Sequence, residues 1–135
     1  MSLTNDIASQ MRPANYIDID VDLFESSIIA LGFVFRNKIA VPGTYIGYDD
    51  IWVQPCSNNV HPLDVAEGKA HKLIADTFHV EFECVNKACQ RAPSGWGPIF
   101  RIKTIGQKID YGWHVLPHEK RNQCRGRNKA LNTLL

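Results

Sequence analysis

Hydrophobic and polar residues alternate most regularly between residues 78 and 85 of this chain. The apolar members of the alternation are Phe78, Val80, Phe82 and Cys84, and the polar residues between them are His79, Glu81 and Glu83. A period of two residues is typical of a strand with one buried and one exposed face. The sequence therefore predicts a half-buried strand in this segment, with both glutamates on its outer side.

Two other stretches repeat their apolar residues with the period of a helix. The apolar stripe of the first is made of Phe24, Ile28 and Leu31. We expect this helix to begin at Asp22, the N-cap of a capping box, and to end at Gly32. A second helix is expected over residues 62–77, with Pro62 in its first turn. Its apolar stripe is made of Leu63, Ala66, Ala70, Leu73 and Ile74.

The rest of the chain is rich in short strand patterns. Strands are expected at residues 16–19, 33–35, 39–41, 44–48 and 51–54, with a short leading helix over 4–11. Residues 99–105 and 108–116 are predicted to pair as a hairpin through Gly106 and Gln107. This order predicts an α+β fold: an antiparallel sheet of hairpins with about two helices on one face, forming one domain over residues 1–135.

The apolar runs and the N-terminal sequence bear on membrane association and cellular location. The longest apolar stretch, Ile28 to Val34, is far shorter than the roughly 18 residues that a membrane span needs, so we expect no membrane association. The first residues lack the apolar core of a secretory signal, which favours a cytoplasmic location with reduced thiols. We therefore expect that Cys84 and Cys89 are not joined by a disulfide.

Charge is distributed unevenly along the chain. Residues 1–86 hold five Lys or Arg against twelve Asp or Glu, a net charge of −7, whereas residues 87–135 hold ten against two, a net charge of +8. Such a split indicates a basic surface for an acidic partner. The alternative is that the two halves neutralise each other, either within one chain or across a homodimer.

The basic half combines cations with aromatic residues, as proteins that bind nucleic acid do. The candidate binding residues are Arg101, Lys103, Lys120, Arg121, Arg125, Arg127 and Lys129. The function predicted from this pattern is that of a small, non-catalytic binding protein whose basic half engages nucleic acid or an acidic protein surface. A self-associating interaction protein is an alternative.

Two further patterns suggest metal chemistry. The first is a possible structural zinc site, whose four ligands would be Cys84, Cys89, His118 and Cys124. The second is the run from Trp113 to Pro117, which together with Asn128 resembles part of the HNH nuclease motif. That resemblance implies His114 as general base and Asn128 on the following helix, with a divalent metal ion at the scissile phosphate. Trp113 departs from the motif, because the family usually has Asp or His there.

Overall fold

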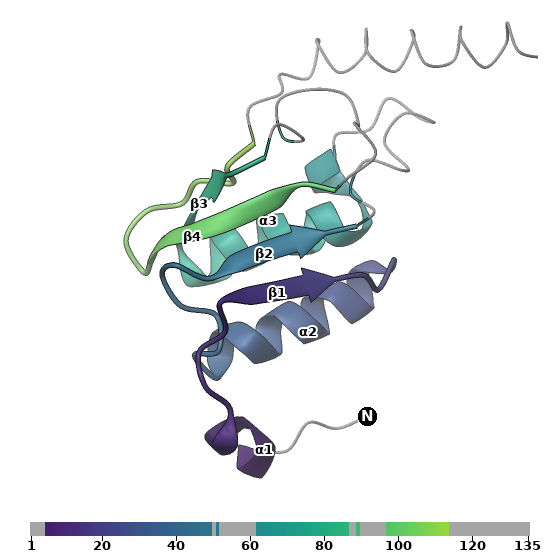
Figure 1. Ribbon diagram of the computed structural model, residues 1–135. Helices are drawn as coiled ribbons and strands as arrows, with labels where there is room; N and C mark the ends of the chain where they lie inside the picture. Colours follow the sequence, from purple (N-terminus) through teal and green to yellow (C-terminus); the bar gives the residue numbers. More distant parts are fainter. Residues whose placement is uncertain (1–4, 50, 52–61, 87–88, 90–96, 114–135) are drawn as a thin grey trace, which may run out of the picture.

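Four strands form one mixed sheet in the order β1-β2-β4-β3 (Figure 1). The strands are β1 (Tyr16–Ile19), β2 (Tyr45–Tyr48), β3 (Val80–Cys84) and β4 (Ile99–Ile105). β1 runs parallel to β2, and β4 runs antiparallel to both β2 and β3. The computed structural model describes residues 5–49, 51, 62–86, 89 and 97–113.

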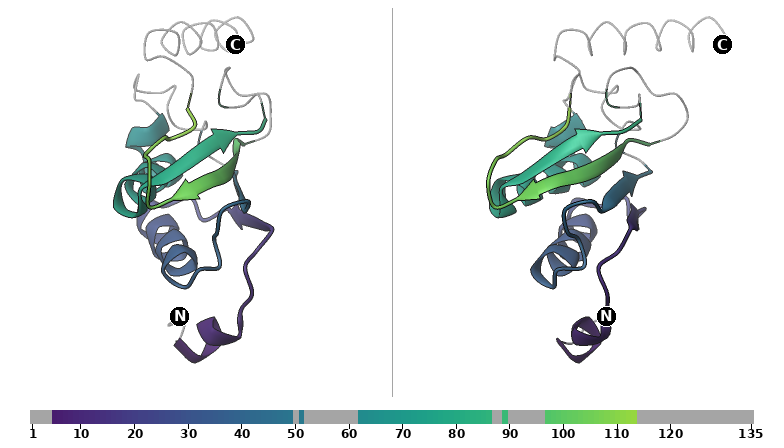
Figure 2. Two further views of the ribbon diagram at one scale, coloured as in Figure 1. Left: turned by 90° about the vertical axis from the view of Figure 1, so that its left-hand side faces the viewer. Right: turned by 60° about the vertical axis from the view of Figure 1, so that its left-hand side comes forward.

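Two long helices, α2 (Phe24–Arg36) and α3 (Ala66–Phe78), pack on the same face of this sheet (Figures 1 and 2). α2 connects β1 to β2, and α3 lies between β2 and β3 in the chain. The crossovers from β1 to β2 and from β2 to β3 move in the same direction across the sheet. Because such crossovers between parallel strands share one handedness, both helices lie on the same side. Two short helices complete the described elements: α1 (Asn5–Gln10) and the 3-10 helix η1 (Pro62–Asp64).

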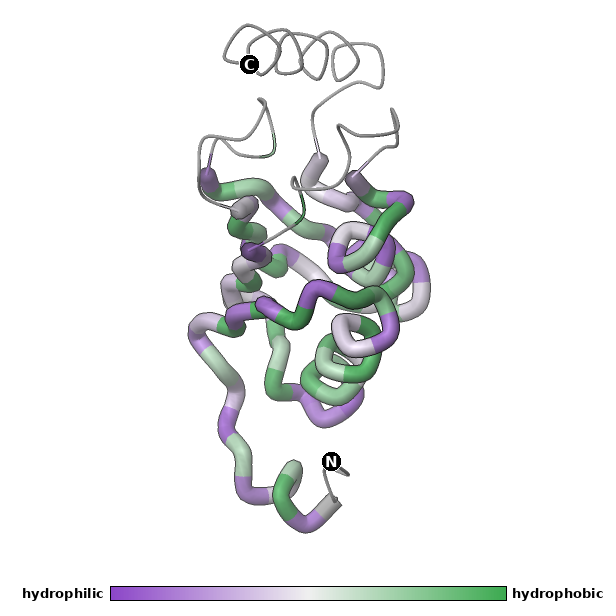
Figure 3. Tube along the Cα trace, turned by 90° about the vertical axis from the view of Figure 1, so that its right-hand side faces the viewer, coloured by the Kyte–Doolittle hydropathy of each residue, from purple (hydrophilic) through white to green (hydrophobic). Residues whose placement is uncertain are grey.

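The hydrophobic core lies between the sheet and the two long helices. It contains the inward side chains of the strands and the facing sides of α2 and α3, among them Ile19, Leu31, Phe35, Ile46, Ile74, Val80, Phe82, Phe100 and Ile102. Glu81 and Glu83 lie between inward residues of β3, as the alternation predicts. Along residues 17–23, aspartates alternate with Ile17, Ile19, Val21 and Leu23. Figure 3 shows hydrophobic and hydrophilic positions alternating along the chain.

The predicted α+β class with two helices on one face is confirmed, but the prediction of an antiparallel sheet of hairpins holds only in part. β1 and β2 are parallel and are joined by a helical crossover. Residues 33–35, expected as a strand, belong to α2, which continues through Gly32 to Arg36. A glycine inside a helix costs about 1 kcal/mol. Burial of Phe35, which is 6% exposed, contributes about 2 kcal/mol and favours the longer helix.

The predicted cap of this helix is also different. The N-cap is Leu23, which has no side-chain cap hydrogen bond. Glu67 on α3 takes over part of this role, because its Oε1 accepts hydrogen bonds from the backbone amides of Val21 at 3.1 Å and Asp22 at 3.3 Å. A carboxylate from another helix therefore satisfies the amides just before α2.

The hairpin predicted through Gly106 and Gln107 is wrong for the described part of its second strand. The chain after the turn runs beside β3 rather than beside β4, with a parallel bridge between Glu81 and Asp110. Asp110 donates its amide to the oxygen of Val80 and accepts from the amide of Phe82. β4 has no room for another strand, since it already lies between β2 and β3.

Candidate functional site

The face of the sheet opposite α2 and α3 carries polar and aromatic side chains from all four strands. We call it the open face, because no described helix covers it (Figures 1 and 2). Its side chains are those of Tyr16, Asp18, Tyr45, Glu81, Glu83, Arg101 and Lys103, which alternate with the inward core residues. Two of the seven binding residues predicted from the sequence, Arg101 and Lys103, lie here.

One row of side chains crosses the whole open face. Tyr16 of β1 is the register partner of Tyr45 on β2, and Tyr45 is the partner of Arg101 on β4. Glu83 on β3 completes the row opposite Arg101. Tyr16 is 51% exposed and Tyr45 is 39% exposed. We refer to Tyr16, Tyr45 and Arg101 as the tyrosine–arginine row, and sequence reasoning missed both of its tyrosines.

A glycine shapes this row. The far end of the Tyr16 ring lies over Gly47 of β2, where an added Cβ would collide with the tyrosine hydroxyl and its ring carbon. The absence of a side chain at this position therefore lets the ring lie across the strand. The Tyr16 hydroxyl points toward Asp18 Oδ1 at 3.5 Å. Partial burial, followed by the negative charge of Asp18, raises the pKa of Tyr16.

The cations of the open face are paired with glutamates. Arg101 Nε lies 3.4 Å from Glu83 Oε2, and Lys103 Nζ lies 3.3 Å from Glu81 Oε1, with Lys108 Nζ 3.8 Å from the same oxygen. The hydrogen bond from Lys103 is the largest cause that lowers the pKa of Glu81. Both glutamates belong to the acidic half and all three cations to the basic half. Part of the charge asymmetry is therefore neutralised within one chain.

The remaining predicted binding residues, Lys120, Arg121, Arg125, Arg127 and Lys129, lie outside the described residues. The same holds for His114 and Asn128 of the HNH resemblance, and for His118 and Cys124 of the predicted zinc set. These assignments stay predictions.

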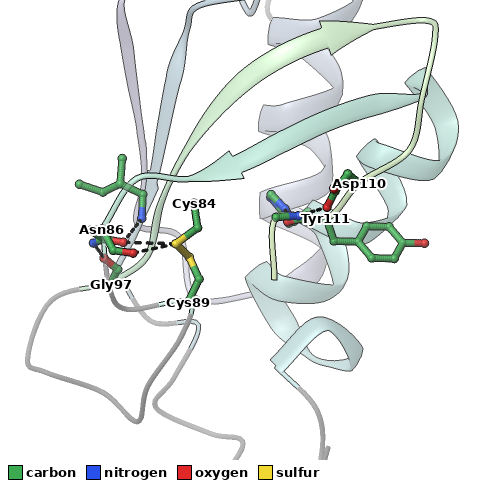
Figure 4. The surroundings of a disulfide bond; sticks show 9 residues. Cys84, Asn86, Cys89, Gly97, Asp110 and Tyr111 are labelled. Carbon is green, nitrogen blue, oxygen red and sulfur yellow. Dashed lines mark hydrogen bonds between the residues drawn. A yellow bond between two sulfur atoms is a disulfide. The ribbon is translucent and has the colours of Figure 1, made fainter. Parts of the chain in front are cut away.

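The expected reduced state of Cys84 and Cys89 is wrong, because the two residues form a disulfide (Figure 4). Their Cα atoms are 6.1 Å apart, within the range that a disulfide bridges. Cys89 itself is fully buried. Two sulfurs bonded to each other are not thiolate ligands, so the predicted zinc set loses half of its members. The cytoplasmic location expected from the sequence stays a prediction.

Asn86 links the end of β3 to the start of β4 by hydrogen bonds (Figure 4). Its side-chain Nδ2 donates to the oxygen of Gly97 at 2.9 Å, and its Oδ1 accepts from the amide of Ile99 at 3.0 Å. Together with the disulfide, Asn86 fixes where the chain leaves β3 and where it enters β4. A loop whose two ends are held by a rigid scaffold is a common way to present binding residues.

A polar cluster lies inside the core, between the sheet and α3. His71 is fully buried, with its Nδ1 2.9 Å from the Tyr48 hydroxyl and its Nε2 2.9 Å from the backbone oxygen of Tyr111. Its ring packs against those of Phe82 and Phe100, at centroid distances of 4.1 and 4.3 Å. Burial lowers the pKa of His71 to about 4. A neutral imidazole enclosed in this way supports the fold and has no access to a substrate.

Acidic side chains gather where β1 and β2 end. The negative charge of Asp49 is the largest cause that raises the pKa of Asp20, followed by partial burial and by the charges of Asp22 and Asp18. Nevertheless, among the described residues no group of three or more His, Cys, Asp and Glu side chains is placed to hold a metal ion.

An open pocket of about 240 Å³ lies on the helix layer, lined by Leu63, Asp64, Lys69, Lys72, Leu73 and Asp76. Lys69 Nζ lies 4.6 Å from the centre of the Phe24 ring, and Lys72 Nζ lies 5.9 Å from that of Tyr111. The pocket is smaller than typical ligand pockets of roughly 300–1,000 Å³. Its two lysines and two aspartates balance, so it favours no class of ligand.

Comparison with known protein families, curated proteins and solved structures finds no match. In the part of the chain that the structure describes, no helix is long and apolar enough to cross a membrane.

Proposed function

We propose that this chain is a non-catalytic binding protein that holds single-stranded nucleic acid on the open face of its sheet. The observation that carries the proposal is the tyrosine–arginine row, in which two exposed aromatic rings and a guanidinium group stand side by side on three adjacent strands. Bases of single strands stack on exposed aromatic rings, and each stacked base contributes about 1–3 kcal/mol. Arg101 next to Tyr45 suits a backbone phosphate between stacked bases.

The shape of the face favours single strands over a duplex. A four-stranded sheet with outward tyrosines is a shallow platform, on which unpaired bases can lie flat. Proteins that recognise the sequence of a duplex insert a helix or a β-ribbon into its major groove. None of the described elements projects from the open face in this way (Figure 2).

The charges of the described residues set a limit on the electrostatic contribution. Glu81 and Glu83 compete with phosphate for Lys103 and Arg101. The proposal therefore assigns most of the affinity at the open face to stacking. The five cations between Lys120 and Lys129, predicted from the sequence, would add phosphate contacts and a stronger dependence on salt.

The proposal is tested by fluorescence anisotropy with labelled single-stranded DNA and RNA of about 12 nucleotides and with the matching duplexes. Tyr45→Ala should weaken binding of the single strands by roughly tenfold, because one stacked base is lost. Tyr45→Phe keeps the ring and should bind almost as the unchanged protein does. Leu73→Ala, on the helix layer, controls for a general loss of stability.

Three results would contradict the proposal. The first is that no single strand binds even at a salt concentration about 100-fold below the physiological one. The second is that Tyr45→Ala and the unchanged protein bind with equal affinity. The third is a clear preference for duplex over single strands. If the same variants instead weaken capture of a polyglutamate peptide while oligonucleotides do not bind, the open face binds acidic protein and the nucleic-acid assignment is wrong.

A further inference from the structure

β1 is the terminal strand of the sheet, and among the described residues it pairs with β2 alone. The amide of Tyr45 donates to the oxygen of Asn15, and the amide of Asp49 donates to the oxygen of Ile19. Main-chain groups alternate between the two sides of a strand, so those of residues 15, 17 and 19 face β2. The N–H and C=O groups of Tyr16 and Asp18 consequently point to the outer side.

The opposite edge of the sheet, formed by β3, is paired with another segment of the chain. There the segment around Asp110 covers β3: the amide of Phe82 donates to the oxygen of Asp110 at 2.8 Å, and the amide of Asp110 donates to the oxygen of Val80 at 3.1 Å. Edge strands that must stay unpaired commonly carry charged side chains, above all lysine, or a proline or a bulge. Within Tyr16–Ile19, β1 has no lysine, proline or bulge, and Asp18 is its single charged residue. The described chain thus covers one edge and leaves the other available for pairing.

We infer that the outer edge of β1 is a self-association surface, on which a second copy of this chain adds its own β1 in antiparallel orientation. A two-fold axis at Ile17 places Tyr16 opposite Asp18 of the partner subunit, and Asp18 opposite Tyr16 of the partner subunit. This register forms four main-chain hydrogen bonds from the groups that face outward. The interface is the same patch on both copies, as a closed two-fold dimer requires.

The side chains suit a second copy of the same strand. The register sets an uncharged residue, Tyr16 of the partner subunit, opposite each Asp18. It pairs Ile17 with Ile17 of the partner subunit on the half-buried, helix-facing side. It also avoids placing the two Asp18 carboxylates directly opposite each other, which would be destabilising.

The dimer goes beyond the proposed function and does not rest on it. Pairing of the two edges would join the two sheets into one of eight strands. The open faces of both copies would then be continuous, with the tyrosine–arginine rows on either side of the axis. The sequence suggests a homodimer in which the acidic half of one chain neutralises the basic half of the other. The inferred dimer forms through main-chain pairing of β1 instead.

The test is sedimentation of the full chain over a concentration series. Asp18→Pro removes an outward amide without removing a hydrogen bond between β1 and β2, and proline is tolerated at such edge positions. Each dimer loses two main-chain hydrogen bonds, so the dissociation constant should rise roughly tenfold or more. Asp18→Ala keeps the amide and is the matched control. Ile29→Glu, on the outward side of α2, should leave the dimer intact.

Hydrogen exchange on the unchanged protein provides a second measurement that does not depend on how Asp18→Pro folds. The amides of Tyr16 and Asp18 should exchange rapidly at low protein concentration and slowly at high concentration. The amide of Phe82, bonded to Asp110, should be slow at both. A monomer at every concentration would overturn the inference, and so would rapid exchange of both β1 amides in the dimer. A dimer that Ile29→Glu dissociates and Asp18→Pro does not would place the interface on the helix layer instead.

Discussion

The hydroxyl of Tyr48 donates a hydrogen bond to Nδ1 of His71 inside the core, and both side chains are buried. Nε2 of His71 faces the backbone oxygen of Tyr111, which can only accept, so Nε2 carries the ring proton. Nδ1 is then the acceptor, and the imidazole is neutral. Burial also raises the pKa of Tyr48, so its hydroxyl stays protonated as a donor.

This arrangement predicts acid sensitivity of the fold. The pKa of His71 falls from about 6.5 in the unfolded chain to about 4 in the folded protein, so the unfolded state binds more protons between these values. Stability is therefore complete above pH 6.5 and is lost as the pH falls toward 4, by about 3 kcal/mol in total. Urea unfolding at pH 7.5, 6.0 and 5.0 measures the slope. His71→Phe should flatten it between pH 6.5 and 5, and an unchanged slope in this variant would assign the effect to other groups.

Glu67 should stabilise the entry into α2. Glu67→Ala leaves the amides of Val21 and Asp22 without the Oε1 acceptor, which predicts a loss of about 2 kcal/mol in the free energy of unfolding. Glu67→Gln keeps an oxygen at the same place and should lose less. Urea denaturation of both variants provides the comparison. Equal losses for the two would mean that these hydrogen bonds contribute little.

The relation of Tyr16 to Gly47 can be measured by a double-mutant cycle. Gly47→Ala should cost about 1 kcal/mol, because the new methyl group displaces the Tyr16 ring from the strand. In a Tyr16→Ala background the same change should cost much less, since no ring is left to displace. Thermal or urea unfolding of the four proteins gives the coupling. Additive costs would show that the ring does not depend on the glycine.

The disulfide predicts a defined redox behaviour. In the denatured, non-reduced protein, Cys84 and Cys89 should not react with a thiol reagent, and mass spectrometry after digestion should find their peptides linked. Closing so short a loop stabilises the fold by about 2 kcal/mol in the chain-entropy account. Reduction should therefore lower the free energy of unfolding by about that amount, with Cys84→Ser/Cys89→Ser insensitive to reductant. Alkylation of both cysteines without prior reduction would contradict the assignment.

The sequence was informative where a single period dominates and misleading where tertiary contacts decide. The alternation around Val80 predicts β3 and its buried side. The apolar stripe of α3 predicts the helix but only part of its buried side, because Leu73 is 42% exposed whereas Glu67 and His71 are buried. The sequence predicts a strand at residues 33–35 because Gly32 favours a helix end, whereas packing of the Phe35 ring 5.4 Å from that of Phe78 extends the helix. The parallel pairing of β1 with β2 has no local signal, because it depends on the helical crossover between them.

The same division holds for the candidate site. The sequence predicts Arg101 and Lys103 as binding residues, and both lie on the open face. Their glutamate partners were placed on the outer side of β3, but pairing across strands could not be read from a single segment. The tyrosine–arginine row was missed because its members lie on three strands far apart in the sequence. Only the sheet register brings them together.

Backbone chemical-shift mapping during titration with a single-stranded oligonucleotide tests the central proposal most directly. We expect the largest shifts on Tyr16, Tyr45, Arg101 and Lys103, with hardly any change at outward residues of the helix layer such as Ile29 and Leu73. Shifts concentrated on α2 and α3, or none at saturating oligonucleotide, would contradict the claim that the open face of the sheet is the binding surface.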